Sequence, residues 1–117
     1  MHSAYHLVPE PWYRAQPEDR PYLPEPFDAD GFVHLTHGLN VVLAVGNMFY
    51  RDDPRPYLLL TIDLGQITSD VRYDDDSRRY PHVYGPLDRA AIVAIQTVER
   101  DIDGSFTGVA PDTTTGR

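Results

Sequence analysis

Apolar residues fall into short runs that prolines and glycines separate. Six of these runs are typical of β-strands, because β-branched and aromatic residues are frequent in them and turn-forming residues bound them. They cover residues 4–8, 31–35, 57–64, 71–73, 82–84 and 91–98. The run at 57–64 is almost entirely apolar. It therefore predicts a central strand that is buried on both faces.

One segment has the spacing of an amphipathic helix. Between residues 37 and 50, apolar or small residues recur every three or four positions, at Leu39, Val42, Leu43, Gly46 and Phe49. This period predicts a helix whose apolar face belongs to the core, with Thr36 as its N-cap. A brief helix or turn is predicted over residues 12–16. The polar, proline-rich residues 17–30 are typical of a surface loop that could lie over a pocket.

The order of these elements predicts a single small domain of the α+β class. A chain of 117 residues has the length of one domain, since compact domains most often hold about 100 to 150 residues. Several short strands with one strong and one weak helix indicate α+β architecture. We expect the domain to span residues 1–106. Residues 107–117 offer almost nothing to bury, which predicts a flexible tail.

Charge and composition narrow the classes of function. With 18 acidic and 10 basic side chains the net charge is -8, which disfavours general binding to nucleic acid or to a membrane surface. The absence of cysteine excludes disulfides, thiolate metal sites and a cysteine nucleophile. The N-terminus lacks the pattern of a signal peptide, and residues 31–50 are too polar to span a membrane. We expect a soluble, cytoplasmic protein.

Histidines are the most informative candidates for chemistry. His6, His34 and His82 lie in extended, apolar surroundings, where an imidazole can act as an acid or base, a hydrogen-bonding group or a metal ligand. Any one of them alone is better explained as a structural residue. Three at the edges of separate strands favour a shared pocket. Tyr84, in the proline-bracketed segment YPHVYGPL, would offer its hydroxyl or its ring to a ligand.

Other catalytic motifs are absent from the sequence. There is no GxSxG, GxGxxG, P-loop or HExxH pattern, so a serine elbow, a glycine-rich phosphate cradle and a helical zinc motif are disfavoured. His34 and His37 would be a possible zinc pair, but they are separated by a strand-to-helix transition rather than placed on one helix face. We therefore rank a histidine metal site as the third option, below a metal-free pocket.

Several motifs together resemble a known bacterial family. They are YHL at residues 5–7, Trp12, GFVHLT at 31–36, NMFY at 47–50, YLLLTID at 57–63, YPHVYGPL at 80–87 and DGSF at 103–106. In this order and at these intervals they resemble the family known as domain of unknown function 952. The resemblance covers residues 4–106, and GFVHLT and YPHVYGPL are its most specific parts.

That family is distantly similar to the ADP-ribosyltransferase fold, whose members bind NAD between two small antiparallel sheets. The similarity implies split antiparallel sheets with one or two helices, and His6 as the residue that holds the nicotinamide-side ribose. Two positions depart from that pattern. His34 stands where a nicotinamide-stacking tyrosine would be, and His82 stands where the catalytic glutamate would be. The second departure matters, because an anion stabilises the oxocarbenium character of nicotinamide–ribose cleavage and a neutral imidazole does not.

Two classes of function remain open at this point. One is a glycosyl-transfer enzyme that acts on NAD or a nucleotide-like small molecule, with His82 and His34 as catalytic residues. The other is a non-catalytic ligand-binding or accessory protein with the same cleft. In both, the partner is a small molecule, and NAD would enter as a substrate rather than as a resident cofactor. The residues expected to hold the ligand are His6, Tyr84, Thr36 and Trp12.

Overall fold

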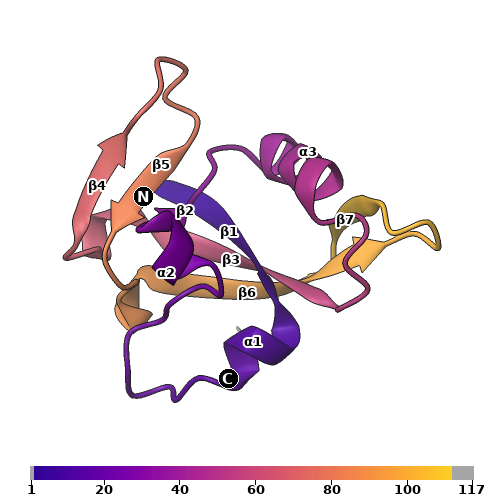
Figure 1. Cartoon of the computed structure of the whole chain (residues 1–117), viewed down its shortest axis with the longest axis horizontal. Coiled ribbons are helices and arrows are strands. Elements are labelled where there is room, and N and C mark those ends of the chain that lie inside the picture. The colour runs from indigo at the N-terminus through magenta and orange to yellow at the C-terminus, as the bar shows by residue number, and fades with distance from the viewer. Residues whose placement is uncertain (1, 112–117) are drawn as a thin grey trace.

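Two antiparallel sheets form the framework of the protein in a computed structural model that describes residues 2–111 (Figure 1). The larger sheet has the order β1 (Ser3–Pro9), β3 (Tyr57–Asp63), β6 (Ile92–Arg100) and β7 (Phe106–Val109). The smaller sheet has the order β2 (Val33–His34), β5 (Pro81–Tyr84) and β4 (Asp70–Tyr73). The predicted single-domain α+β fold is confirmed.

Short helices join the strands. Helix α1 (Glu10–Arg14) follows β1 directly, and α2 (Phe27–Asp30) ends the proline-rich loop. Helix α3 (Leu39–Phe49) packs against β1 and β7. The 3-10 turns η1 (Leu64–Gln66) and η2 (Arg89–Ala91) precede β4 and β6. Within residues 2–111, no helix is both long and apolar enough to span a membrane.

Strand β3 is the buried centre of the larger sheet, as its apolar run predicts. It pairs with β1 on one side and β6 on the other, and its side chains alternate between two cores. Leu58, Leu60 and Ile62 belong to the core shared with the smaller sheet. Tyr57 and Leu59 belong to the core beneath α3. Both faces of β3 are therefore covered, so an apolar side chain is buried whichever face of the strand it lies on.

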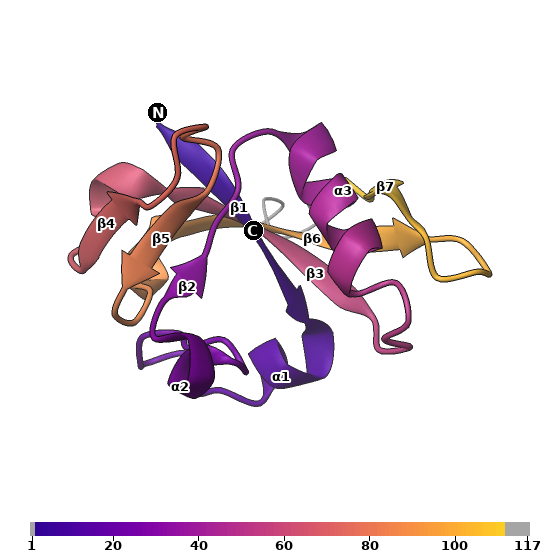
Figure 2. The same cartoon turned by 45° about the horizontal axis from the view of Figure 1, so that its top comes forward.

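The two sheets meet at one point and then diverge. Tyr5 of β1 and Thr36, just after β2, exchange two backbone hydrogen bonds of 2.8 Å each. Past this bridge β1 continues towards α1, whereas the chain carrying β2 turns away (Figure 2). The edge of β1 from His6 to Pro9 thus has a strand partner only on the β3 side. This divergence is what makes room for a cavity between the sheets.

Helix α3 differs from its prediction at both ends. Its N-cap residue is Gly38, with φ at 92°, and no side chain caps it. The prediction that Thr36 caps the helix is wrong, because Thr36 is held in the bridge to β1 two residues earlier. Leu39 and Phe49 are exposed although they lie on the predicted core face. They stand at the two ends of the helix, and only its middle packs on the sheet through Val42 and Gly46.

Strand β7 carries the fold past residue 106. Val109 pairs with Val98, and Gly108 with Glu99, along the free edge of β6. The expected start of the tail therefore falls inside a strand. The segment is short and contains glycine and threonine, and its apolar residues are too few for a periodic pattern. Residues 112–117 of the predicted tail lie outside the described residues.

We predict that Gly46→Ala destabilises the protein by about 1–2 kcal/mol, although alanine is the better helix former. A Cβ atom at this position would lie 2.5 Å from Cδ2 of Phe106 on β7. The ring or the helix would have to move, and this costs more than the helix propensity of alanine contributes. Urea unfolding at pH 7 measures the difference. A stabilised variant would contradict the close approach of α3 to β7.

Candidate ligand-binding site

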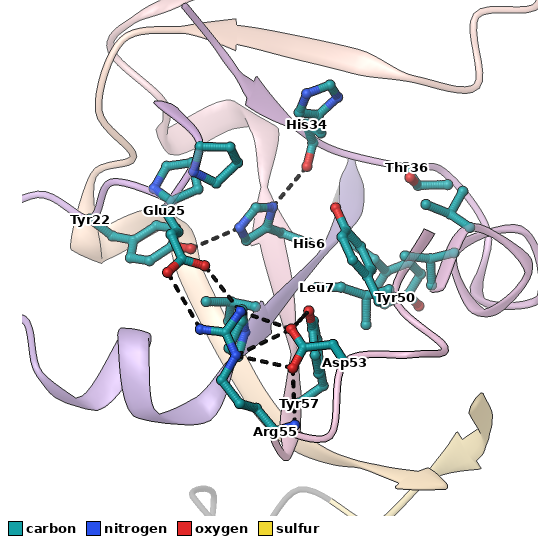
Figure 3. A pocket seen from close by; sticks show the side chains of 17 residues that line it. His6, Leu7, Tyr22, Glu25, His34, Thr36, Tyr50, Asp53, Arg55 and Tyr57 are labelled. Carbon is teal, nitrogen blue, oxygen red and sulfur yellow. Dashed lines mark hydrogen bonds and ion pairs between the residues drawn. The ribbon is translucent and has the colours of Figure 1, made fainter. Parts of the chain in front are cut away.

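A cavity of about 270 Å³ occupies the place where the sheets diverge (Figure 3). Strand β1 forms one wall with His6 and Leu7. The proline-rich loop forms a second wall that includes Tyr22, and α3 with the residue that follows it contributes Val45 and Tyr50. Most of this lining is apolar or aromatic, with a few polar groups. That combination is typical of small-molecule sites, although the volume is at the low end of their usual range.

His6 is a buried, uncharged hydrogen-bonding group in this cavity. Its Nδ1 lies 2.8 Å from the carbonyl oxygen of His34, and a carbonyl only accepts, so Nδ1 carries the hydrogen. Its Nε2 therefore accepts a hydrogen bond of 2.9 Å from the hydroxyl of Tyr22. Burial lowers the pKa of His6 to about 4. The imidazole is neutral at pH 7, and its tautomer is fixed from both sides.

Tyr22 completes this neutral pair. Its side chain is fully buried, and burial raises the pKa of its hydroxyl. The residue is held in place because its backbone bridges to Leu87 through two hydrogen bonds of 2.8 and 2.9 Å. The loop that carries Tyr22 is thus fixed at this point, and the hydroxyl is directed at His6 (Figure 3).

The side-chain hydroxyls of Thr36 and Tyr50, two residues of the cavity lining, have no protein partner among residues 2–111. Thr36 is 5% exposed and its backbone is bonded to Tyr5, but its side-chain hydroxyl makes no hydrogen bond to the described residues. The hydroxyl of Tyr50 makes none either, and burial raises its pKa. A buried hydroxyl without a partner costs free energy. Both groups are therefore suited to contact a bound molecule.

An ion cluster closes one end of the cavity. Arg55 donates to both oxygens of Asp53, at 3.1 Å from Nε to Oδ1 and 2.8 Å from Nη2 to Oδ2, and to Oε1 of Glu25 at 3.0 Å. The hydroxyl of Tyr57 also donates to Asp53, at 2.8 Å. The Arg55 hydrogen bonds hold the pKa of Asp53 well below its usual range. The cluster ties the proline-rich loop to the segment before β3.

The histidines and Tyr84 do not share one pocket. His6 lines the cavity, but His34 contributes its carbonyl while its ring points away (Figure 3). His82 and Tyr84 are not among the residues that line it. They alternate along β5 with the fully buried Val83, so they lie on the opposite face of the smaller sheet. The expectation of a common pocket is corrected in this respect.

The residues on that opposite face form an outer cluster, which consists of Phe32, His34, His82 and Tyr84. The ring of Phe32 stacks on His82 with centroids 4.1 Å apart. His82 Nδ1 lies 2.8 Å from Asp74 Oδ2, and the Tyr84 hydroxyl donates to the same oxygen. This hydrogen bond lowers the pKa of Asp74 and raises that of Tyr84. Acid–base chemistry by His82 would take place at this surface and not in the cavity.

Trp12 and Thr36 are placed differently from each other. Thr36 lines the cavity, whereas Trp12 does not. The indole Nε1 of Trp12 donates to the carbonyl of Leu23 at 2.8 Å, and Gln16 bonds the same residue through both ends of its amide. Trp12 therefore fixes the loop that forms one cavity wall. A direct contact with a ligand stays a prediction.

Several cavity residues were not singled out by the sequence. They are Tyr22, Glu25, Tyr50, Asp53 and Arg55. Four of these come from the two proline-flanked loops, whose conformation follows no periodic pattern. Tyr50 offered a signal, because it ends both the motif NMFY and the predicted helix. A half-buried tyrosine at the end of such a helix is well placed to reach the adjoining cleft.

The arrangement does not provide a metal centre in the described part of the chain. Within residues 2–111, no three or more His, Asp or Glu side chains are grouped so as to hold a metal ion. His37 lies 3.0 Å from the Ser3 carbonyl through Nδ1 and 2.7 Å from the Tyr73 hydroxyl through Nε2. Both of its nitrogens are engaged, which removes support for a zinc pair with His34.

Fold and site together define a small α+β domain in which two antiparallel sheets diverge around a cavity of ligand size. The family described as protein of unknown function (DUF952) matches residues 7–95, and the chain belongs to this family. This confirms the family resemblance inferred from the sequence motifs.

Two solved structures have the same fold. Protein CC0527 from Caulobacter crescentus superimposes with a TM-score of 0.76 and is 19% identical over 91% of this chain and 94% of that chain. A double mutant of CC0527 gives a TM-score of 0.75 at the same identity and coverage. At this level of identity the likeness establishes the fold. No curated protein matches the chain.

Proposed function

We propose that this protein binds a small ring-containing metabolite, of the nicotinamide or nucleoside kind, in the cavity between its sheets. The observation that carries the proposal is the buried, neutral His6–Tyr22 pair beside the unpartnered hydroxyl of Thr36. In a largely apolar cavity, such convergent polar groups orient a ligand and give specificity. A volume of about 270 Å³ suits one ring system and is too small to enclose a dinucleotide.

The walls of the cavity fit a flat ligand. Val45 and Tyr50, both only partly buried, border the cavity from α3 and the residue that follows it. Aromatic and apolar surfaces of this kind favour a planar ring through burial and offset stacking. The ring edge would meet the hydroxyls of Thr36 and Tyr50, which accept or donate according to the ligand.

The same geometry supports ligand binding without turnover. This is the non-catalytic one of the two functions that the sequence left open. A general base works best when its pKa is near the operating pH, whereas His6 has a pKa of about 4 and uses both nitrogens. No serine of residues 2–111 lines the cavity, so none of them is placed to act as a nucleophile there. The carboxylates of Asp53 and Glu25 are already bonded to Arg55.

Transfer chemistry on NAD is the second candidate. It is supported by the position of His6, which lies on the first strand and in the opening between two antiparallel sheets. The resemblance to the ADP-ribosyltransferase fold assigns the ribose-holding histidine to this residue. In that function His6 would position the ligand, while His82 and Tyr84 lie too far around the sheet to contact it. Release of nicotinamide from NAD by the purified protein would favour this candidate over simple binding.

We expect Val45→Trp to weaken binding of adenosine or nicotinamide by at least about 30-fold, because the indole and the ligand would compete for the same space. Val45 lines the cavity from a partly exposed position on α3. Ala44→Trp is the matched control, since Ala44 is exposed on the same helix and is outside the cavity lining. Isothermal titration calorimetry should give the wild-type Kd for the control. Wild-type affinity in folded Val45→Trp would contradict the cavity as the site.

A further inference from the structure

We infer that the ligand of this cavity carries no negative charge, so that the site takes a free base or nucleoside and rejects the corresponding acid or phosphate ester. The inference rests on the proposed function and specifies the charge class of its ligand. It follows from the hydrogen bonds and ion pairs that the charged side chains around the cavity already make with one another.

Among the described residues, Arg55 is the one Arg or Lys side chain that lines the cavity, and all three of its guanidinium nitrogens already make hydrogen bonds. Arg55 uses Nε and Nη2 for Asp53, and it uses Nη2 and Nη1 for Glu25, at 3.0 and 3.4 Å. All three nitrogens of its guanidinium thus face a carboxylate of the protein. Recognition of a phosphate or carboxylate normally depends on a free guanidinium or ammonium, or on several converging N–H groups. An anionic ligand would have to displace Glu25 or Asp53 from Arg55.

The ion cluster is also net negative. Glu25 and Asp53 contribute two negative charges and Arg55 one positive charge. Tyr57 donates to Asp53, which stabilises the carboxylate form further. Like charges at close range repel, and the effect grows as solvent is excluded. A phosphate placed at this end of the cavity would meet an excess of negative charge.

Four polar side chains of the cavity, those of His6, Tyr22, Thr36 and Tyr50, are neutral at pH 7. His6 is uncharged at pH 7, and the hydrogen of the Tyr22 hydroxyl is directed at it. Thr36 and Tyr50 offer hydroxyl groups that have no partner among residues 2–111. Groups of this kind pair well with an amide, a ring nitrogen or a sugar hydroxyl. They supply no charge to compensate an anion that leaves water.

Two matched pairs of compounds test the inference by calorimetry at pH 7.5 and low salt. Nicotinamide is compared with nicotinate, and adenosine with adenosine monophosphate, because the members of each pair share a ring system and differ in charge. The neutral member is expected to bind at least about tenfold more tightly in each pair.

A charge variant sharpens the test. Glu25→Gln removes one carboxylate and leaves Asp53 on Arg55, so it should improve binding of the anionic member about threefold. The neutral member should gain less than the anionic member, because only the anion interacts strongly with the charge that is removed. Glu18→Gln is the control for net charge, since Glu18 belongs to the same loop but does not line the cavity.

The outcomes separate the inference from the function on which it rests. If the anions bind as tightly as the neutral compounds, and Val45→Trp abolishes both, the inference is overturned and the ligand-binding function stands. If no member of either pair binds, both are overturned. Tighter binding of the neutral members together with the Glu25→Gln effect confirms the charge class.

Discussion

Lowering the pH from 7 to 4 is expected to cost the protein about 3 kcal/mol of unfolding free energy through His6 alone. Burial lowers the pKa of His6 from 6.5 to about 4. In the unfolded chain the same imidazole titrates near 6.5, so the unfolded state binds more protons between these two values. The contribution of neutral His6 to the unfolding free energy is therefore complete above pH 6.5. It is lost progressively as the pH falls to 4. The unfolding free energy must rise with pH across this window.

Urea unfolding of the wild type and of His6→Gln at pH 7, 5.5 and 4 measures this effect. The variant is expected to be less stable at pH 7, because the Tyr22 hydroxyl and the His34 carbonyl lose their partner. It should also lack most of the dependence between pH 6.5 and 4. Asp53, whose pKa is lowered by Arg55, begins to lose its contribution near pH 4 in both proteins, so the difference between wild type and variant isolates His6. An NMR titration that places the pKa of His6 near 6.5 would contradict the argument.

Arg100→Lys is expected to destabilise the protein by about 2–4 kcal/mol. The Arg100 guanidinium donates to four backbone carbonyls, at 2.8 Å to Arg55, 3.0 Å to Arg51, 3.3 Å to Tyr50 and 3.0 Å to Gly104. These bonds tie the segment between α3 and β3 to the β6–β7 turn. The ammonium group of a lysine cannot reach all four of these carbonyl oxygens. Because some of the carbonyls would regain water, the loss is smaller than the sum of the individual bonds.

The segment held by Arg100 also shapes the cavity, since it carries Tyr50, Asp53 and Arg55. Arg100→Lys should therefore weaken ligand binding as well as stability. Arg72→Lys is the matched control: Arg72 is exposed on β4 and pairs only with Asp70 at 3.3 Å among the described acidic side chains, so the change should cost less than about 0.5 kcal/mol. Equal stability of the two variants in urea unfolding would show that the carbonyl contacts of Arg100 contribute little.

The fold class was predictable because its main strands have strong local patterns. The apolar runs that became β1 and β3 are buried on both faces, so burial and sequence agree at nearly every position. Strand β7 and helix α2 were missed because neither is an apolar run: β7 contains Thr107 and Gly108, and α2 has two aspartates at the end of a proline-rich loop. The start of α3 was misplaced because the Tyr5–Thr36 bridge, a contact between distant segments, decides the conformation of Thr36.

The candidate site was predictable only in part. His6 and Thr36 both line the cavity, and their role in ligand binding stays a prediction. His34 and His82 were grouped with them because all three histidines stand in apolar runs. Alternation along the strands separates them, since Val33 and Val83 point into the core and their neighbours point out. The loop residues of the cavity depend on tertiary contacts, such as the bridge from Tyr22 to Leu87, which no local pattern encodes.

The most direct measurement is NMR mapping of side-chain signals while adenosine or nicotinamide is added to the wild-type protein. The cavity site predicts saturable shifts for the methyl groups of Val42, Val45 and Thr36, with the signals of the outer cluster unchanged. Shifts confined to His82 and Tyr84, with the cavity methyl groups unaffected, would place the ligand on the outer face of the smaller sheet and contradict a binding site between the sheets.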